Sequence, residues 1–208
     1  MIRRVLIPAS AAALLLLATA CGQQSDERVE PADSAAAEVV PSAESLQSEV
    51  AAATPYVTLD CVSLQGMPVD APPASGVTLG STTAIFQPNG APAITVATDA
   101  QQATELGIAD IREGDGAEVV AGDTVTVQYC GVGYGGQVVF DSSWARGEPA
   151  TFPLDNLIPG WQEGIPGMKV GGQRLLEIPG ELAYGEAGNQ GIGPNETLAF
   201  VIQLDAIG

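Results

Sequence analysis

Residues 90–208 consist of short stretches of alternating apolar and polar residues, separated by glycine and proline. Val125, Val127 and Tyr129 alternate with polar neighbours, which is the pattern of a strand with one buried face. The stretch 197–207 repeats this alternation at the end of the chain. Short strands between turn-forming residues are typical of a mainly antiparallel sheet.

One short helix interrupts the predicted strands. Pro159 suits the first helical turn, because proline lacks an N–H group that would have no partner there. Trp161, Ile165 and Met168 follow at helical spacing and form one apolar face. A mainly antiparallel sheet covered by one short helix predicts an α+β fold of two layers.

The first twenty residues are typical of an export signal. Arg3 and Arg4 precede an apolar stretch that ends in small residues before Cys21. A transmembrane anchor is one alternative, but a spanning helix needs about 20 apolar residues. The small residues and Cys21 resemble the lipobox of a bacterial lipoprotein, in which the cysteine is lipidated, although Ala18 stands where leucine is usual. We therefore expect an extracytoplasmic protein anchored to the cell membrane by lipid on Cys21, with simple secretion as the other alternative.

The chain between this signal and the compact region has two parts. Residues 21–54 are rich in alanine, serine and glutamate and lack aromatic residues, which predicts a flexible acidic tether. Residues 55–89 contain β-branched runs interrupted by prolines, and are compatible with edge strands or with a loosely ordered extension. The expected organisation is a signal peptide at 1–20, the tether, this extension and a compact domain at 90–208.

The charge and the missing histidine exclude several classes of function. The chain has 25 acidic against 7 basic residues, a formal net charge of −18, which is unfavourable for binding the phosphates of nucleic acid. It has no histidine, so Ser-His-Asp and Cys-His catalysis, histidine-ligated metals and imidazole acid–base chemistry are excluded. We expect no cofactor, no metal and no nucleic-acid partner.

Six motifs follow one another in the second half of the chain. They are Val127–Gly131, Val139–Ser143, Ile158–Gly164, Met168–Gly171, Leu182–Gly185 and Gly191–Phe200. Their order and spacing resemble those of the FKBP-type peptidyl-prolyl cis-trans isomerases, and the resemblance covers roughly residues 104–208. It implies a curved five-stranded antiparallel sheet wrapped around the short helix, with a shallow apolar pocket between them.

The resemblance also implies which residues form this pocket. Trp161 is the expected floor under the substrate proline, and Tyr184 offers a hydroxyl to a substrate carbonyl. Asp141 is expected at the pocket edge, held by Tyr129 and Arg146. The expected catalytic residues are Tyr129, Phe140, Asp141, Trp161, Tyr184 and Phe200. The expected substrate-binding residues are Arg146, Phe152, Leu157, Ile158 and Ile192.

Three positions depart from the family pattern. Ala150 falls where members often carry an aromatic wall residue, and Asn189 stands in a loop where some carry histidine. Gly193 replaces a bulkier apolar residue after Ile192. We expect these changes to alter substrate preference and affinity for macrolides, and to leave the pocket floor intact.

Prolyl isomerisation is compatible with the composition. It breaks no bond, its barrier is the roughly 18–20 kcal/mol of amide resonance, and a catalyst need only bind the twisted amide better than the planar forms. The expected function is isomerisation of Xaa-Pro bonds in proline-containing polypeptides as exported or cell-envelope proteins fold, by a monomer. The alternatives are a peptide-binding or chaperone module of the same fold with little or no activity, and a purely structural lipoprotein domain.

Two cysteines remain besides Cys21. Cys130 follows Tyr129 in the predicted strand, so its side chain faces away from that of Tyr129. In an oxidising compartment Cys61 and Cys130 can form a disulfide, which would hold the extension to the sheet. Two unpaired thiols are the alternative, and the sequence favours neither.

Overall fold

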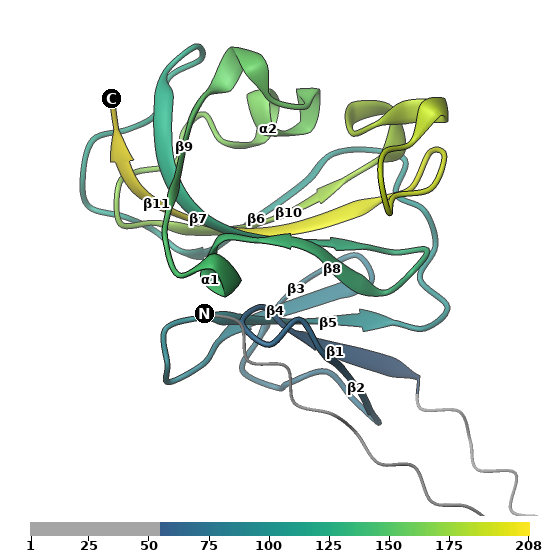
Figure 1. Cartoon of the computed structure of the whole chain (residues 1–208). Helices are drawn as coiled ribbons and strands as arrows, with labels where there is room; N and C mark the ends of the chain where they lie inside the picture. Colours follow the sequence, from purple (N-terminus) through teal and green to yellow (C-terminus); the bar gives the residue numbers. More distant parts are fainter. Residues whose placement is uncertain (1–54) are drawn as a thin grey trace, which may run out of the picture. The chain divides into compact units, whose positions relative to one another are not determined.

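The computed structural model describes residues 55–208, which form two antiparallel sheets (Figure 1). The signal peptide, Cys21 and the tether predicted for residues 1–54 lie outside the described residues. Among the helices of the described part, none is long and apolar enough to cross a membrane.

The first sheet contains five strands in the order β2-β1-β5-β4-β3. They are β1 (Tyr56–Asp60), β2 (Gly66–Val69), β3 (Val77–Leu79), β4 (Thr82–Phe86) and β5 (Pro92–Ala97). The extension at 55–89 thus supplies four strands of a complete sheet, and the boundary expected near residue 90 falls inside that sheet. Its prolines are compatible with pairing, because Pro68 lies in the edge strand β2 and Pro92 is the first residue of β5.

The second sheet has six strands where five were expected. They are β6 (Gly107–Arg112), β7 (Thr124–Gly133), β8 (Val138–Ser142), β9 (Ala150–Pro153), β10 (Gln173–Ile178) and β11 (Leu198–Ile207). The order is β6-β10-β11-β7-β8, and β9 also pairs with β7. The sixth strand arises because β7 is ten residues long. Its first half, Thr124 to Val127, pairs with β9, and its second half, Cys130 to Gly133, pairs with β8.

The helices of the described region are short. They are α1 (Ser143–Arg146), α2 (Pro159–Gly164) and the single-turn 3₁₀ helices η1 (Leu154–Asn156), η2 (Gly180–Leu182) and η3 (Gly185–Ala187). The predicted helix at Pro159 is present, but it ends at Gly164, because Pro166 has no N–H with which to continue it. Ile165 and Met168, expected on its apolar face, lie beyond its end and are nevertheless buried.

Two glycines let α2 approach the second sheet closely. A Cβ on Gly160 would lie 2.4 Å from Cγ2 of Ile178, and one on Gly164 would lie 2.9 Å from Leu176. Both neighbours belong to β10. The short helix therefore packs directly on the sheet, and the side chain of Trp161 is fixed between them.

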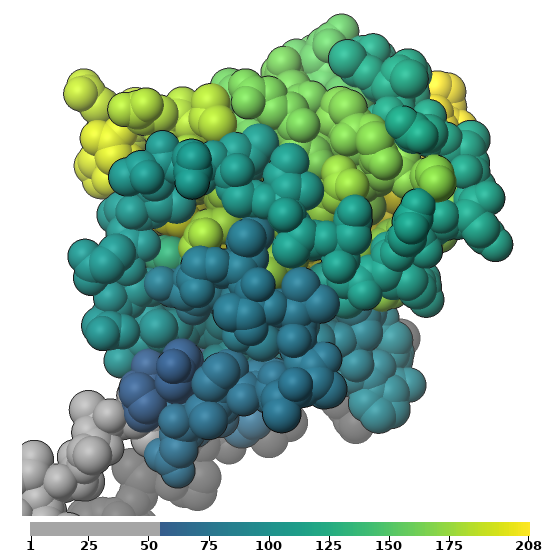
Figure 2. Space-filling model, turned by 180° about the vertical axis from the view of Figure 1, so that it is seen from behind, coloured from purple at the N-terminus to yellow at the C-terminus, as the bar shows by residue number. Residues whose placement is uncertain are grey.

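Each face of the second sheet has its own apolar core. Alternate residues of β11, such as Phe200 and Ile202, join α2 and the pocket side, whereas Ala199 and Val201 point the other way. The first sheet covers this other face, opposite α2 (Figure 1), and the space-filling view shows the blue residues of this part of the chain directly against teal and green residues that follow in the sequence (Figure 2). Ten-residue β11 is therefore buried on both faces along most of its length.

Candidate active site

A pocket of about 310 Å³ lies between α2, the adjoining loops and the second sheet. It is lined by Tyr129, Phe140, Asp141, Phe152, Asn156, Leu157, Ile158, Trp161, Tyr184 and Phe200. The structure thus brings together nine of the eleven residues expected there. Arg146 lies at the pocket edge through its bonds to lining residues, and Ile192 is buried in the apolar core on the same side of the sheet.

Trp161 occupies the centre of the aromatic part of the pocket. Its side chain is only 3% exposed, and α2 presents it from its first turn. Its ring lies 5.2 Å from Phe200 and 5.5 Å from Tyr129, centroid to centroid, and both contacts are edge-to-face. Phe152 approaches the same ring at 6.4 Å, also edge-on. Edge-to-face packing is a preferred arrangement of aromatic rings, so these neighbours hold the indole in one orientation.

The polar edge of the pocket consists of three side chains, Tyr129, Asp141 and Arg146. The Tyr129 hydroxyl donates to Oδ2 of Asp141 at 2.5 Å, and Arg146 donates to Oδ1 of the same carboxylate. Arg146 also donates through Nη2 to the Tyr129 hydroxyl at 2.8 Å and lies over the Tyr129 ring. The ion pair is about two-fifths exposed, and such pairs stabilise a fold by only ~0–1 kcal/mol. Its effect is therefore to orient the carboxylate.

Strand alternation explains how these residues meet. Asp141 lies in β8 opposite Gly131 of β7, two positions from Tyr129, so the side chains of Tyr129 and Asp141 lie on one face. Arg146 ends α1, which follows β8 directly, and Gly147 closes that helix in the left-handed conformation with φ of 78°.

Comparison with known proteins assigns the chain to a family. The sequence model described as "FKBP-type peptidyl-prolyl cis-trans isomerase" matches residues 116–205. A "Probable FK506-binding protein" of Corynebacterium glutamicum is 53% identical over 100 residues, which cover 48% of this chain and 85% of that protein. The chain belongs to the FKBP-type peptidyl-prolyl cis-trans isomerase family.

A second relative agrees with this assignment. An "FK506-binding protein" of Streptomyces anulatus is 50% identical over 107 residues, covering 50% of this chain and 86% of that protein. The crystal structure of FkpA from Escherichia coli is 44% identical, with a TM-score of 0.47, and the match covers 51% of this chain and 50% of that chain. The enzyme class predicted from the motifs, an FKBP-type prolyl isomerase, is confirmed by the family.

Two residues that line this FKBP pocket carry potential donors without a partner in the described part of the chain. Ile158 immediately precedes α2, and Tyr184 immediately precedes η3. Within residues 55–208 neither the Ile158 N–H nor the Tyr184 hydroxyl makes a hydrogen bond. Both groups are therefore free to bind a carbonyl oxygen placed in the pocket.

The three departures from the FKBP pattern lie outside the pocket lining. Ala150 pairs with Val127 in the β9–β7 ladder, two residues before Phe152. Asn189 forms a two-way backbone bridge with Ile192, at 2.8 and 3.0 Å, which shapes the loop before β11. The Gly193 N–H donates to the carboxylate of Glu196 at 2.6 Å.

Sequence reasoning missed two residues of this region. Asn156 lines the pocket from η1, but an isolated asparagine in a single-turn helix follows no periodicity. Glu196 receives N–H groups from Gly193 and Gly135 and so ties the loop before β11 to the β7–β8 turn. An acidic residue next to glycine-rich turns was the available signal for Glu196, since such turns expose several N–H groups.

The phenol of Tyr129 should ionise at a higher pH than a solvent-exposed tyrosine. Burial, reinforced by the hydrogen bond to Asp141, raises the pKa of Tyr129 to about 12. An unfolded tyrosine has a pKa of about 10, so the stability contributed by neutral Tyr129 is complete below about pH 10 and is lost as the pH rises toward 12. We expect the tyrosinate absorbance of this residue, the difference between wild type and Tyr129→Phe, to develop near pH 12. Ionisation near pH 10 would contradict the buried hydrogen bond.

Proposed function

We propose that this pocket catalyses the isomerisation of Xaa-Pro bonds in exported or cell-envelope polypeptides by binding the twisted amide. The observation that carries the proposal is the aromatic pocket floored by Trp161, with unpaired donors at its rim. Its volume of about 310 Å³ lies at the small end of ligand pockets, which suits one proline ring and its peptide bond.

The substrate proline would rest on Trp161, between the rings of Tyr129 and Phe200. Its preceding carbonyl loses amide conjugation as the bond twists, so the twisted amide carries less separated charge than the planar forms. An apolar pocket therefore solvates the planar amide poorly and disfavours the twisted amide less, which lowers the barrier between them. Each ~1.4 kcal/mol of this difference is about tenfold in rate.

The polar groups of the pocket orient the peptide. The Ile158 N–H and the Tyr184 hydroxyl would donate to substrate carbonyls on either side of the proline. Asp141, held by Tyr129 and Arg146, places a fixed negative charge at the edge where the twisting carbonyl turns. None of these groups exchanges a proton with the substrate, so the chemistry runs without histidine.

Substitutions at the edge and rim test the proposal. Asp141→Ala should lower kcat/KM for Xaa-Pro peptides about tenfold, the loss expected for one charge-assisted interaction. Tyr184→Phe should lower it about three- to tenfold, since one neutral hydrogen bond is lost. A protease-coupled assay on a set of Xaa-Pro peptides measures both.

The matched control for the acid is Asp205→Ala, an exposed aspartate of β11, which should leave kcat/KM unchanged. Wild-type protein that binds proline-containing peptides but turns over none of them would contradict catalysis and leave the peptide-binding module as the function.

We further infer that the chain is a lipoprotein anchored through Cys21. The basic start, the apolar stretch and the small residues before Cys21 support this inference. The disulfide between Cys61 and Cys130 is consistent with it, because disulfides persist in oxidising compartments outside the cytoplasm. Removal of residues 1–20 would take away Arg3 and Arg4 and leave 5 basic against 25 acidic residues, a net charge of −20. Such a chain would be repelled by anionic lipid, so attachment would depend on acyl chains.

Mass spectrometry of the mature N-terminus tests the anchor. The expected mass corresponds to a chain that begins at a diacylated or triacylated Cys21, and Cys21→Ala should release the protein from the membrane fraction. An unmodified N-terminus upstream or downstream of Cys21 would contradict lipidation.

A further inference from the structure

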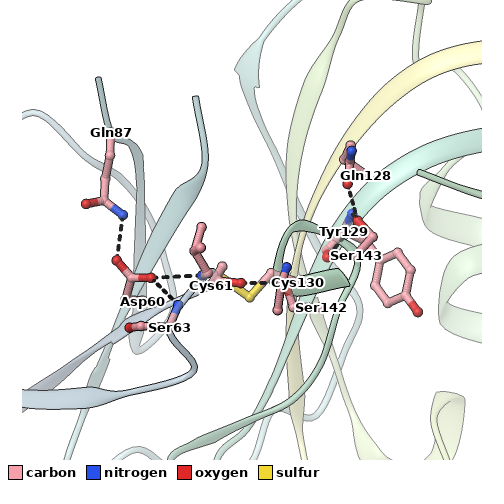
Figure 3. The surroundings of a disulfide bond; sticks show 11 residues. Asp60, Cys61, Ser63, Gln87, Gln128, Tyr129, Cys130, Ser142 and Ser143 are labelled. Atoms are coloured by element: carbon pink, nitrogen blue, oxygen red, sulfur yellow. Dashed lines mark hydrogen bonds between the residues drawn. A yellow bond between two sulfur atoms is a disulfide. The ribbon is translucent and has the colours of Figure 1, made fainter. Parts of the chain in front are cut away.

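The turn that carries Cys61 directly follows β1 and is held by hydrogen bonds to Asp60 (Figure 3). Asp60 accepts the N–H groups of Val62 and Ser63 through Oδ1, both at 2.8 Å, and the Gln87 amide at Oδ2. The Ser63 N–H, the strongest of these influences, helps to lower the pKa of Asp60, so the carboxylate stays charged. Cys61 itself is fully buried and donates its N–H to Pro92.

Two bonds from Cys61 join this turn to the strands that carry pocket residues. Cys61 forms a disulfide with Cys130 of β7. The backbone carbonyl of Cys61 accepts a hydrogen bond of 2.6 Å from the Oγ of Ser142, which is only 3% exposed. Cys130 and Ser142 are partners in the register of the β7–β8 ladder, so the two bonds from Cys61 reach neighbouring positions on adjacent strands. The adjacent strands β7 and β8 are thus both bonded to Cys61, which directly follows β1 of the first sheet.

Each residue bonded to Cys61 directly follows a pocket residue in the sequence. Cys130 follows Tyr129 in β7, and Ser142 follows Asp141 in β8. Because side chains alternate along a strand, the residues bonded to Cys61 point toward the first sheet and their neighbours point toward the pocket. Tyr129 and Asp141 are the two residues that share the hydrogen bond at the pocket edge.

The first sheet also holds α1, which carries Arg146. Ser142 is the N-cap of this helix, and its Oγ accepts the N–H of Ala145 at 3.3 Å. Trp144 of α1 packs edge-on against Phe86 of β4, with ring centroids 5.9 Å apart. The elements that carry the polar edge, Tyr129, Asp141 and Arg146, are therefore all held by contacts with the first sheet and the turn after β1.

We propose that Ser142 and the Cys61–Cys130 disulfide are positioning residues for the polar edge of the isomerase pocket. The inference rests on the proposed function of that edge. A functional group must be held within about 0.5 Å of its productive geometry, so residues that position the carboxylate contribute to the rate without touching substrate.

A double-mutant cycle in the full chain tests this. Ser142→Ala should lower kcat/KM for an Xaa-Pro peptide about fivefold in the wild-type background and less than about twofold in the Asp141→Ala background, because coupled residues are not additive. The Cys61→Ala and Cys130→Ala double substitution should show the same non-additivity. An equal loss of kcat/KM in both backgrounds would overturn the proposal, because a general loss of folded protein acts regardless of Asp141.

Tyr134→Phe is the matched control. The Tyr134 hydroxyl bonds Thr82 and Glu177 in the same interface between the sheets, but it lies outside the pocket lining. This variant should lower stability and leave kcat/KM within about twofold, in keeping with a residue that has no contact with the reacting group. A loss of kcat/KM equal to that of Ser142→Ala would also overturn the proposal.

A readout without activity separates this proposal from the proposed function. If wild-type protein turns over no peptide, the proposed function fails, and ionisation of Tyr129 still reports the geometry of the edge. Ser142→Ala should then move the Tyr129 transition in a tyrosinate titration below its wild-type position near pH 12, because the bond to Asp141 loosens. An unchanged transition would show that Ser142 does not position this pair.

Discussion

Removal of the disulfide by Cys61→Ala and Cys130→Ala is expected to lower the free energy of unfolding by about 4 kcal/mol. The bridged residues are 69 positions apart, so the bond closes a long loop and removes much of the conformational freedom of the unfolded chain. Both sulfurs lie in the apolar core between the two sheets, and their loss also removes contacts there. Denaturant unfolding of the full chain, followed by tryptophan fluorescence, measures the change.

Reduced wild-type protein is the control for the side-chain volume that the two cysteine-to-alanine substitutions remove. Reduction breaks the same bond and keeps both sulfur atoms, so it should reproduce most of the destabilisation. An unchanged unfolding midpoint for both the reduced protein and the double variant would contradict a stabilising role of the disulfide.

Trp161→Ala is expected to have the largest effect on activity, with kcat/KM lowered by more than about tenfold, since a difference of ~1.4 kcal/mol in transition-state binding already has that effect. The indole is the floor of the pocket and contacts the rings of Tyr129 and Phe200. Its removal leaves a cavity in the core, which should also lower the free energy of unfolding by about 3–5 kcal/mol.

Ile165→Ala separates these two effects. Ile165 is fully buried directly after α2, in the same apolar core, but it does not line the pocket. Its truncation should cost about 2–5 kcal/mol of stability and leave kcat/KM of the folded protein near the wild-type value. Equal losses of kcat/KM in the two variants, measured where both are folded, would mean that the indole acts only through stability.

The first sheet allows the second sheet to carry apolar residues on the face opposite α2. A sheet with one face on α2 and the other on solvent would have an exposed outer face, yet β10 is buried at all six positions, its polar Gln173 and Glu177 included. The apolar residues Leu175, Ala199 and Val201 fill the interface with the first sheet instead. The isomerase region of this chain thus depends on residues that precede the family match at 116–205.

Much of the second sheet could be predicted from local patterns, and the pocket from the resemblance to a known family. Alternation along 124–129 and 197–207 located β7 and β11, because the side chains of a strand with one buried face alternate between apolar and polar. Pro159 located the start of α2 for an equally local reason. The aromatic residues of the pocket were implied by the family resemblance that the motifs carry, and Asn156 was missed because it belongs to none of those motifs.

The first sheet, the sixth strand and the disulfide were decided by tertiary structure. The prolines in residues 55–89 interrupt the strand patterns of the sequence. The structure shows that Pro68 is tolerated because it lies in the edge strand β2. Pairing of Cys61 with Cys130 requires that two segments 69 residues apart lie with Cα atoms 5.9 Å from each other, a distance that no local pattern encodes. The sequence by itself determined which residues alternate and which rings gather at the pocket. Packing between distant segments determined what covers the other face and what holds the pocket edge in place, because such contacts depend on the whole chain.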